Sequence, residues 1–195
     1  MGAILVQAVR WENASRAVEN LKRAGILDSF CLAEIDLDHL SGLIRPSGYH
    51  NAKARKLRQL ALHLVRNHGG RIESLLDRSP EEARQELLSV WGVGPETADS
   101  ILLYGGGHPA FVVDAYTGRI MQRLGLWSGR GGYEGLKKLF SRNLPEDPGM
   151  FCEYHALLVR LAKKACFKSD PLCGACPLGS YCSSGGDEQG TGPSS

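Results

Sequence analysis

Four cysteines near the end of the chain have the spacing of a compact metal centre. Six, two and five residues separate them, so all four thiolates could close around one centre. A [4Fe–4S] cluster takes four cysteine ligands. Tetrahedral zinc also takes four ligands, but usually from two Cys-x2-Cys pairs, and this segment contains only one such pair. We therefore expect an iron–sulfur cluster, with zinc or two disulfides as the alternatives, on Cys166, Cys173, Cys176 and Cys182.

A glycine turn between two apolar segments offers a second kind of chemistry. Gly92 and Gly94 flank Val93, and glycine permits the positive φ of a tight turn that exposes backbone N–H groups. The helix predicted from Pro95 onward would point the positive end of its dipole at the same place. Such a turn can bind one phosphate of a nucleic acid backbone without reading its bases. Many helical hairpins use glycine for geometry alone, and that is the alternative.

Asp114 is a third candidate, because it follows the apolar run Phe111-Val112-Val113 and begins a predicted helix. An aspartate in that position is commonly the N-cap, which accepts a hydrogen bond from the first turn. It could also be a partly buried carboxylate that faces a cleft and takes part in catalysis. The two roles are compatible with each other.

Basic residues gather in two runs beside these motifs. Between positions 41 and 66 there are six basic residues and no acidic one, and a second run overlaps the start of the cysteine segment. Either run could be a solvated helix face. Their position beside the glycine turn and the cysteines favours contacts with DNA phosphates instead. The candidates for these contacts include Lys53, Lys163 and Lys164.

The composition is that of a globular protein. The chain has 195 residues, of which 43% are hydrophobic and 23% charged, enough apolar material for a core. The net charge of +2 is too small to imply nucleic acid binding by itself. No apolar run approaches the roughly 18 residues of a membrane span, and the first residues lack the features of a signal peptide. We expect a monomer in the cytoplasm, associated with the nucleoid and not with a membrane.

Apolar residues recur at helical spacing along nearly the whole chain. Ser79, Pro80 and Glu82 have the pattern of a helix start with a capping box. The only β-like run, 111–113, is too short to build a sheet. We predict an all-α protein of about eight to ten short helices. A lobe boundary is expected near 105–109, and the Gly/Ser-rich segment 183–195 is expected to be disordered.

Taken together, these motifs resemble the endonuclease III superfamily of DNA glycosylases, the helix-hairpin-helix proteins with a catalytic aspartate. The resemblance covers about residues 2–182, in which the hairpin 88–98, Val113-Asp114, Arg119 and the cysteines occur in the family's order. It implies a two-lobed helical fold, with a six-helix barrel lobe over 1–108 and a helical cluster lobe over 109–182. It also implies that the protein binds double-stranded DNA containing a damaged base, with Arg119 among the phosphate contacts.

Within the superfamily, three segments look most like the 3-methyladenine glycosylase III branch. In that branch an aromatic residue at the position of Trp11 stacks on the extruded base, although Trp11 could instead be a packing residue. Gln7 would lie in the base pocket or fill the gap left in the DNA. Bifunctional members carry a lysine just after the hairpin, where this chain has Glu96, so strand cleavage through an imine on that residue is excluded. The three segments are 45–53, 94–99 and 112–116.

The resemblance implies a monofunctional glycosylase for an alkylated purine. The base must be flipped out of the duplex before its glycosidic bond can be reached. Ionised Asp114 would stabilise the developing oxocarbenium ion and activate the attacking water. Glu96 would position that water or stabilise the helix start. The alternatives are a uracil or thymine-mismatch glycosylase on the same scaffold, and a non-catalytic protein that binds DNA structures.

Overall fold

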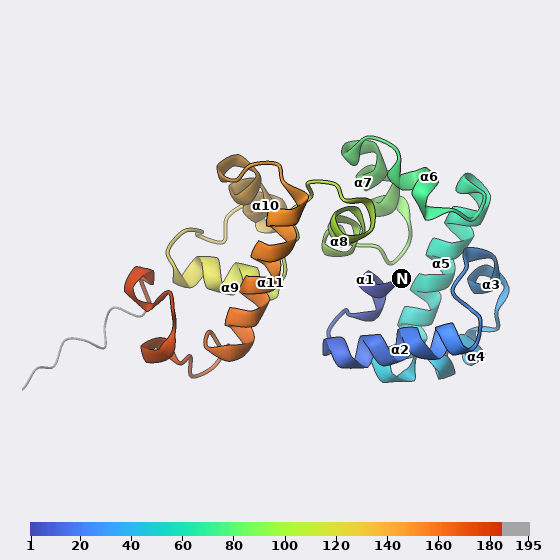
Figure 1. Ribbon diagram of the computed structural model, residues 1–195, viewed down its shortest axis with the longest axis horizontal. Coiled ribbons are helices and arrows are strands. Elements are labelled where there is room, and N and C mark those ends of the chain that lie inside the picture. Colours follow the sequence, from blue (N-terminus) through green and yellow to red (C-terminus); the bar gives the residue numbers. More distant parts are fainter. Residues whose placement is uncertain (185–195) are drawn as a thin grey trace, which may run out of the picture. The chain divides into compact units, whose positions relative to one another are not determined.

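The computed structural model describes residues 1–184. Every regular element in that range is a helix (Figure 1), so the all-α prediction is confirmed. There are eleven α-helices and three short 3-10 helices among the described residues. The apolar run at 111–113 belongs to no helix or strand in that range. None of the described helices is both long and apolar enough to cross a membrane.

The chain divides into two compact units, an N-terminal unit of Met1–His108 and a C-terminal unit that starts at Pro109. The helices of the N-terminal unit are α1 (Gly2–Leu5), α2 (Trp11–Arg23), α3 (Ser29–Glu34), α4 (Leu37–Leu43), η1 (Arg45–Ser47), α5 (His50–His68), α6 (Ile72–Leu76), α7 (Pro80–Ser89) and α8 (Pro95–Gly106). Those of the C-terminal unit are α9 (Ala115–Arg123), α10 (Gly132–Asn143), α11 (Pro148–Lys164), η2 (Cys173–Ala175) and η3 (Gly179–Tyr181).

Helix α5 is the centre of the N-terminal unit. It packs against α1, α3, α4, α6 and η1. Its buried residues include Leu57, Leu60, Ala61 and Leu64, whose spacing places them on one face of the helix. Burying side chains of this size contributes about 1.5–3 kcal/mol each for the leucines. The helix ends where Gly69 adopts a left-handed conformation with φ of 57°.

The hairpin formed by α7 and α8 is fixed at its start and in its interior. Ser79 accepts from the Glu82 N–H and the Glu82 side chain accepts from the Ser79 N–H, so the predicted capping box is confirmed. Asp99 on α8 is fully buried, and Arg84 on α7 donates to its two oxygens at 2.8 and 3.2 Å. Removing either partner of such a buried pair is strongly destabilising. The two helices therefore hold the intervening turn on a rigid base.

Aromatic packing forms the core of the C-terminal unit. The Phe111 ring stacks on Phe140 with a centroid distance of 3.8 Å, and meets Phe151 edge-on at 5.2 Å. All three side chains are buried. Such pairs contribute about 0.5–1.5 kcal/mol beyond burial alone. This core anchors the segment that leads directly into Asp114 and α9.

The predicted disordered segment 183–195 lies outside the described residues except for its first two. Those two are ordered by hydrogen bonds, contrary to the prediction. Ser183 Oγ donates to the Leu124 carbonyl and Ser184 Oγ donates to that of Arg123, each at 3.2 Å. The end of α9 therefore fixes the chain just beyond the last cysteine.

Candidate functional site

The hairpin turn has the geometry of a phosphate-binding turn, with one change from the prediction. Gly92 has φ of 86°, and Gly94 is the N-cap of α8 with no side-chain cap. The Val93 N–H, however, donates to the Val90 carbonyl at 3.0 Å and closes the turn. Val93 therefore contributes a buried side chain and not a donor. The N–H groups that could meet a phosphate are those of the two glycines and of the first turn of α8.

Lys56 explains why position 92 must be glycine. A Cβ atom on Gly92 would lie 2.5 Å from Lys56 Cγ, in a backbone conformation that other residues rarely adopt. Beyond this contact, Lys56 Nζ donates to Gln7 Oε1 at 2.7 Å, and Gln7 Nε2 donates to Thr97 Oγ1 at 2.6 Å. The amide of Gln7, predicted to serve the base pocket, thus links α5 to α8. It positions the segment between α1 and α2.

Lys53 does not fit the predicted phosphate contact, because its ammonium group is buried. The residue is 2% exposed. Its Nζ donates to the carbonyls of Leu5 at 2.9 Å and Gln7 at 2.8 Å, and also to that of Ser47. Each of the three N–H donors of the ammonium group thus has a carbonyl acceptor. Burial, together with the nearby charge of Lys56, lowers the pKa of Lys53 to about 8.

Two exposed aromatic residues flank this fixed segment. Trp11 is the first residue of α2 and is 62% exposed, which does not fit a core residue. Tyr49 is 75% exposed at the start of α5, with φ of 45°. A Cβ atom on Gly48 would lie only 3.3 Å from Val9 Cγ1, so the segment before α2 lies against the one before Tyr49. Tyr49 was not predicted from the sequence. The feature that could have indicated it is an aromatic residue that follows a glycine directly before a helix.

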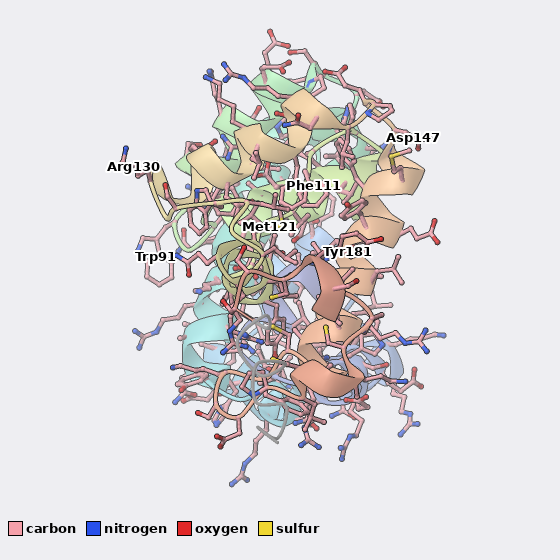
Figure 2. The ribbon with its side chains drawn as sticks, turned by 90° about the vertical axis from the view of Figure 1, so that its left-hand side faces the viewer. Trp91, Phe111, Met121, Arg130, Asp147 and Tyr181 are labelled. Carbon is pink, nitrogen blue, oxygen red and sulfur yellow. The ribbon has the colours of Figure 1, made fainter. Side chains whose placement is uncertain are left out.

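A third exposed aromatic residue lies on the hairpin. Trp91 is 60% exposed and projects from the turn in Figure 2. Glu96 is also exposed and lies in the first turn of α8, where the helix dipole stabilises a carboxylate. The catalytic role of Glu96 stays a prediction.

Asp114 is the N-cap of α9, as its position predicted. Its Oδ1 accepts hydrogen bonds from the Thr117 N–H at 2.7 Å and the Thr117 hydroxyl at 2.8 Å. Its Oδ2 lies 3.6 Å from Nε2 of His155 on α11, and both side chains are largely buried. Burial acts to raise the pKa of Asp114, but the interactions with His155 and Thr117 outweigh it and hold the pKa below its ordinary value. The carboxylate is therefore ionised at neutral pH.

His155 was not among the predicted site residues. It lies on a different helix from Asp114, and no spacing rule connects the two positions. A histidine on the inner face of a predicted helix was the one signal available in the sequence.

The four predicted ligand cysteines lie in one short segment of the C-terminal unit. Cys166 follows the end of α11, Cys173 begins η2, and Cys176 and Cys182 directly follow η2 and η3. None is in a disulfide bond within the described range. Arg123 donates to Cys166 Sγ at 3.2 Å, a hydrogen bond that suits a cluster-bound thiolate. Four partly exposed thiols in one short segment, one of them bonded by a guanidinium group, are a donor set that suits an iron–sulfur cluster.

Arg119, predicted to contact a phosphate, supports the cysteine segment instead. Its Nε and one terminal nitrogen donate to the Cys166 carbonyl at 3.1 and 2.8 Å. Its guanidinium group also lies 5.2 Å from the ring centre of Tyr116. The other two predicted phosphate contacts of this unit, Lys163 and Lys164, are exposed in the last turn of α11. They are available to a DNA backbone.

Comparisons with known proteins agree on the family. Residues 1–146 match the family model described as HhH-GPD superfamily base excision DNA repair protein. A protein of Methanocaldococcus jannaschii that carries the name of a DNA repair glycosylase is 44% identical over 183 residues, which is 93% of this chain and 83% of that protein.

Two further relatives differ in the substrate that their names give. A thymine-DNA glycosylase of Aeropyrum pernix is 34% identical over 155 residues, which is 77% of this chain and 66% of that protein. The crystal structure of the H. pylori 3-methyladenine DNA glycosylase bound to 1,N6-ethenoadenine matches with a TM-score of 0.75 and 26% identity. It covers 84% of this chain and 82% of that one.

Proposed function

This chain belongs to the HhH-GPD superfamily of base excision DNA repair proteins, and we propose that it is a monofunctional DNA glycosylase for alkylated purines such as 3-methyladenine. Its substrate would be double-stranded DNA that contains the damaged base. We also propose that it acts as a monomer in the cytoplasm, associated with the nucleoid. The observation that carries the mechanism is the ionised, partly buried carboxylate of Asp114.

The geometry of Asp114 assigns different tasks to its two oxygens. Oδ1 accepts both hydrogen bonds from Thr117, and Oδ2, which lies 3.6 Å from His155 Nε2, is the oxygen that would act on the substrate. Its negative charge would stabilise the oxocarbenium ion that forms as the C1′–N bond breaks. Water then adds to C1′ and gives up a proton to Asp114 Oδ2, which passes it to solvent, while the electron pair of the broken C1′–N bond leaves with the base. The products are the free base and an abasic site in an intact strand.

The exposed aromatic residues of the N-terminal unit support an alkylated purine as substrate. N3- or N7-alkylated purines carry positive charge and leave without much help from an acid. The indole of Trp11 suits such a cation through stacking and cation–π attraction. Tyr49, exposed beside the same segment, would contact unstacked bases near the lesion. Similarity to the 3-methyladenine DNA glycosylase supports this assignment.

Binding to the rest of the duplex would be independent of sequence. The N–H groups of Gly92 and Gly94 would take one phosphate, while Lys163 and Lys164 would take others. A [4Fe–4S] cluster on the four cysteines would hold the segment that carries the second contact. When bound, the cluster supplies a rigid cross-link among Cys166, Cys173, Cys176 and Cys182, which otherwise lie in a segment poor in apolar side chains.

Glu96 determines the monofunctional part of the proposal. A carboxylate cannot form an imine with the abasic sugar, so the strand would stay intact until alkali is added. Glu96 itself would position the attacking water or stabilise the start of α8. Borohydride reduction tests this directly: it should trap no covalent protein–DNA adduct. A trapped adduct would overturn the monofunctional assignment.

Base release from defined duplexes tests the substrate. DNA carrying 3-methyladenine or 7-methylguanine should lose the alkylated base, and duplexes with uracil or thymine opposite guanine should not. Similarity to the thymine-DNA glycosylase favours the second candidate, a thymine- or uracil-mismatch enzyme. Release of thymine or uracil with the alkylated bases left in place would establish that candidate and refute the first.

A further inference from the structure

The strongest unassigned feature of the N-terminal unit is a group of two histidines and a glutamate between α5 and α7. His63 and His68 lie in the last two turns of α5, and Glu86 lies on α7. His63 Nε2 is 2.8 Å from Glu86 Oε1, and His68 Nε2 contacts the same oxygen. One ligand atom from each residue lies within 4.8 Å of the other two. None of these residues belongs to the candidate glycosylase site.

We propose that His63, His68 and Glu86 bind one divalent transition-metal ion of the Zn²⁺ class. Two imidazole nitrogens and one carboxylate oxygen are a donor set that zinc commonly takes from proteins, with water as the fourth ligand. A tetrahedral zinc ion holds its ligand atoms about 3.3 Å apart. Glu86 Oε1 must therefore move away from His63 Nε2 by about 0.5 Å and from His68 Nε2 by about 0.8 Å, which rotations of the three side chains supply.

The three ligand side chains differ in exposure, so two of them are fixed by packing and the third can be reached by an ion. The side chain of His68 is 2% exposed and that of Glu86 is 16% exposed, so packing fixes both. The side chain of His63 is 20% exposed, which leaves a path for the ion and for a bound water. The three donors therefore need little ordering when the ion binds.

Neighbouring side chains orient the ligands in the way that metal sites require. Arg78 donates to Glu86 Oε2 at 2.8 Å and leaves Oε1 directed at the histidines. Asn67 Nδ2 lies 3.2 Å from His63 Nδ1. If the Asn67 amide turns over, its oxygen accepts a hydrogen bond from Nδ1–H, and Nε2 is left unprotonated to bind the ion. Such outer contacts are a regular feature of histidine ligands.

The same contacts also form a hydrogen-bond network without metal, and the two arrangements differ in where the imidazole protons are. In the network, both Nε2 atoms carry protons and donate to Glu86 Oε1. In the metal site, both Nε2 atoms are unprotonated and each neutral ring keeps its proton on Nδ1. The two arrangements can therefore be distinguished by the state of the ring nitrogens in the intact protein.

A bound ion would connect the central helix of the unit to the first helix of the hairpin. Glu86 lies one turn before the end of α7, so the ion would restrain the base of the turn that contains Gly92. Because an ion that binds only the folded state stabilises it by mass action, the midpoint of thermal unfolding should rise with Zn²⁺ concentration and then saturate.

Histidine nitrogen NMR on the full-length protein tests the proposal without any variant. Zn²⁺ is added to the protein as purified, and the ring nitrogens of His63 and His68 are followed. The proposal expects both Nε2 signals to change from the protonated to the metal-bound type at one equivalent. Signals that stay of the protonated type at excess Zn²⁺ would overturn it and leave the hydrogen-bond network as the explanation.

Matched variants separate this site from the four cysteines, because thiolates are zinc ligands as well. His63→Gln removes the most exposed ligand, and His39→Gln alters an exposed histidine outside the group. Zinc and iron are counted after dialysis, and Co²⁺ absorption distinguishes the sites because only thiolates give intense charge-transfer bands. His63→Gln should lose one Zn²⁺ per chain and the thermal shift, with the iron content unchanged; His39→Gln should lose neither. Equal zinc binding by the two variants would refute the site.

Discussion

Thr117 donates both of its hydrogen bonds to the same oxygen of Asp114, from its N–H at 2.7 Å and from its hydroxyl at 2.8 Å. The N-cap bond and the predicted catalytic role therefore use different oxygens of one carboxylate. Because Thr117 is fully buried, water does not compete for these bonds. The start of α9 is thus a helix cap that, together with His155, holds the pKa of Asp114 below its ordinary value.

Replacing Thr117 with valine should raise the pKa of Asp114, because one hydrogen bond to the ionised form is lost while the side-chain shape is kept. A pKa below its ordinary value contributes stability that is present above the unfolded-state pKa and lost as pH falls through the folded-state value. Thr117→Val should therefore reduce the free energy of unfolding by about 1.5–3 kcal/mol at pH 7. The loss should shrink in acid.

Urea unfolding at pH 7 and near pH 3 measures the effect of Thr117→Val on stability. The acid limb of the activity profile should also move to higher pH. Thr97→Val is a useful comparison, since it also removes a buried threonine hydroxyl, that of the Gln7 bond, but it lies in the N-terminal unit and Asp114 in the C-terminal one. An equal shift of the acid limb in both variants would contradict the role given to Thr117.

The two hairpin glycines should respond differently to alanine. Gly92→Ala places a Cβ atom against Lys56 at positive φ, which costs about 1–2 kcal/mol from the backbone conformation alone. Gly94 has φ of −95° and open space around its Cβ position, so Gly94→Ala should change stability by much less. Thermal unfolding with a DNA-binding titration checks this. Equal losses of stability in both variants would contradict the assigned geometry.

Substitution of Lys53 and of Lys163 should show the difference between a lysine that stabilises the fold and one that binds DNA. Lys53→Met leaves three buried carbonyls without their donor, so it should destabilise the fold by about 2 kcal/mol or more. The salt dependence of DNA binding should stay unchanged. Lys163→Met should leave stability unchanged and reduce the salt slope by about one. The salt slopes come from binding titrations at several ionic strengths; a reduced slope for Lys53→Met would restore the phosphate contact predicted from sequence.

Arg119 and Arg123 should determine how well the cysteine segment keeps its cluster. Arg119→Lys removes the paired donors to the Cys166 carbonyl, and Arg123→Lys weakens the bond to Cys166 Sγ. Both variants should retain less iron per chain and lose their visible absorption faster in air than the wild type. Arg160→Lys, on an exposed part of α11, is the control and should match the wild type. Iron analysis and absorption spectra provide the comparison.

The sequence predicted the parts of the molecule that depend on neighbours along the chain. The capping box at Ser79, the hairpin turn and the N-cap Asp114 all follow from local hydrogen-bonding rules, and the family resemblance added the order of the motifs. The structural contacts of Lys53 and Arg119 were not predicted, because Lys53 bonds the carbonyls of Leu5 and Gln7 and Arg119 bonds that of Cys166, each 46 to 48 positions away. A charge pattern alone does not show that a cation is buried. His155 and the group around Glu86 depend on contacts between helices and could not be predicted from spacing.

Base release by wild-type protein and by Asp114→Asn tests the central claim most directly. Asparagine keeps an N-cap acceptor but lacks the negative charge, so both proteins should bind an alkylated duplex equally well. The wild type should release the alkylated purine and leave a strand that breaks only after alkali, and Asp114→Asn should be slower by about a hundredfold or more. Release at the wild-type rate by Asp114→Asn would contradict the catalytic role of Asp114.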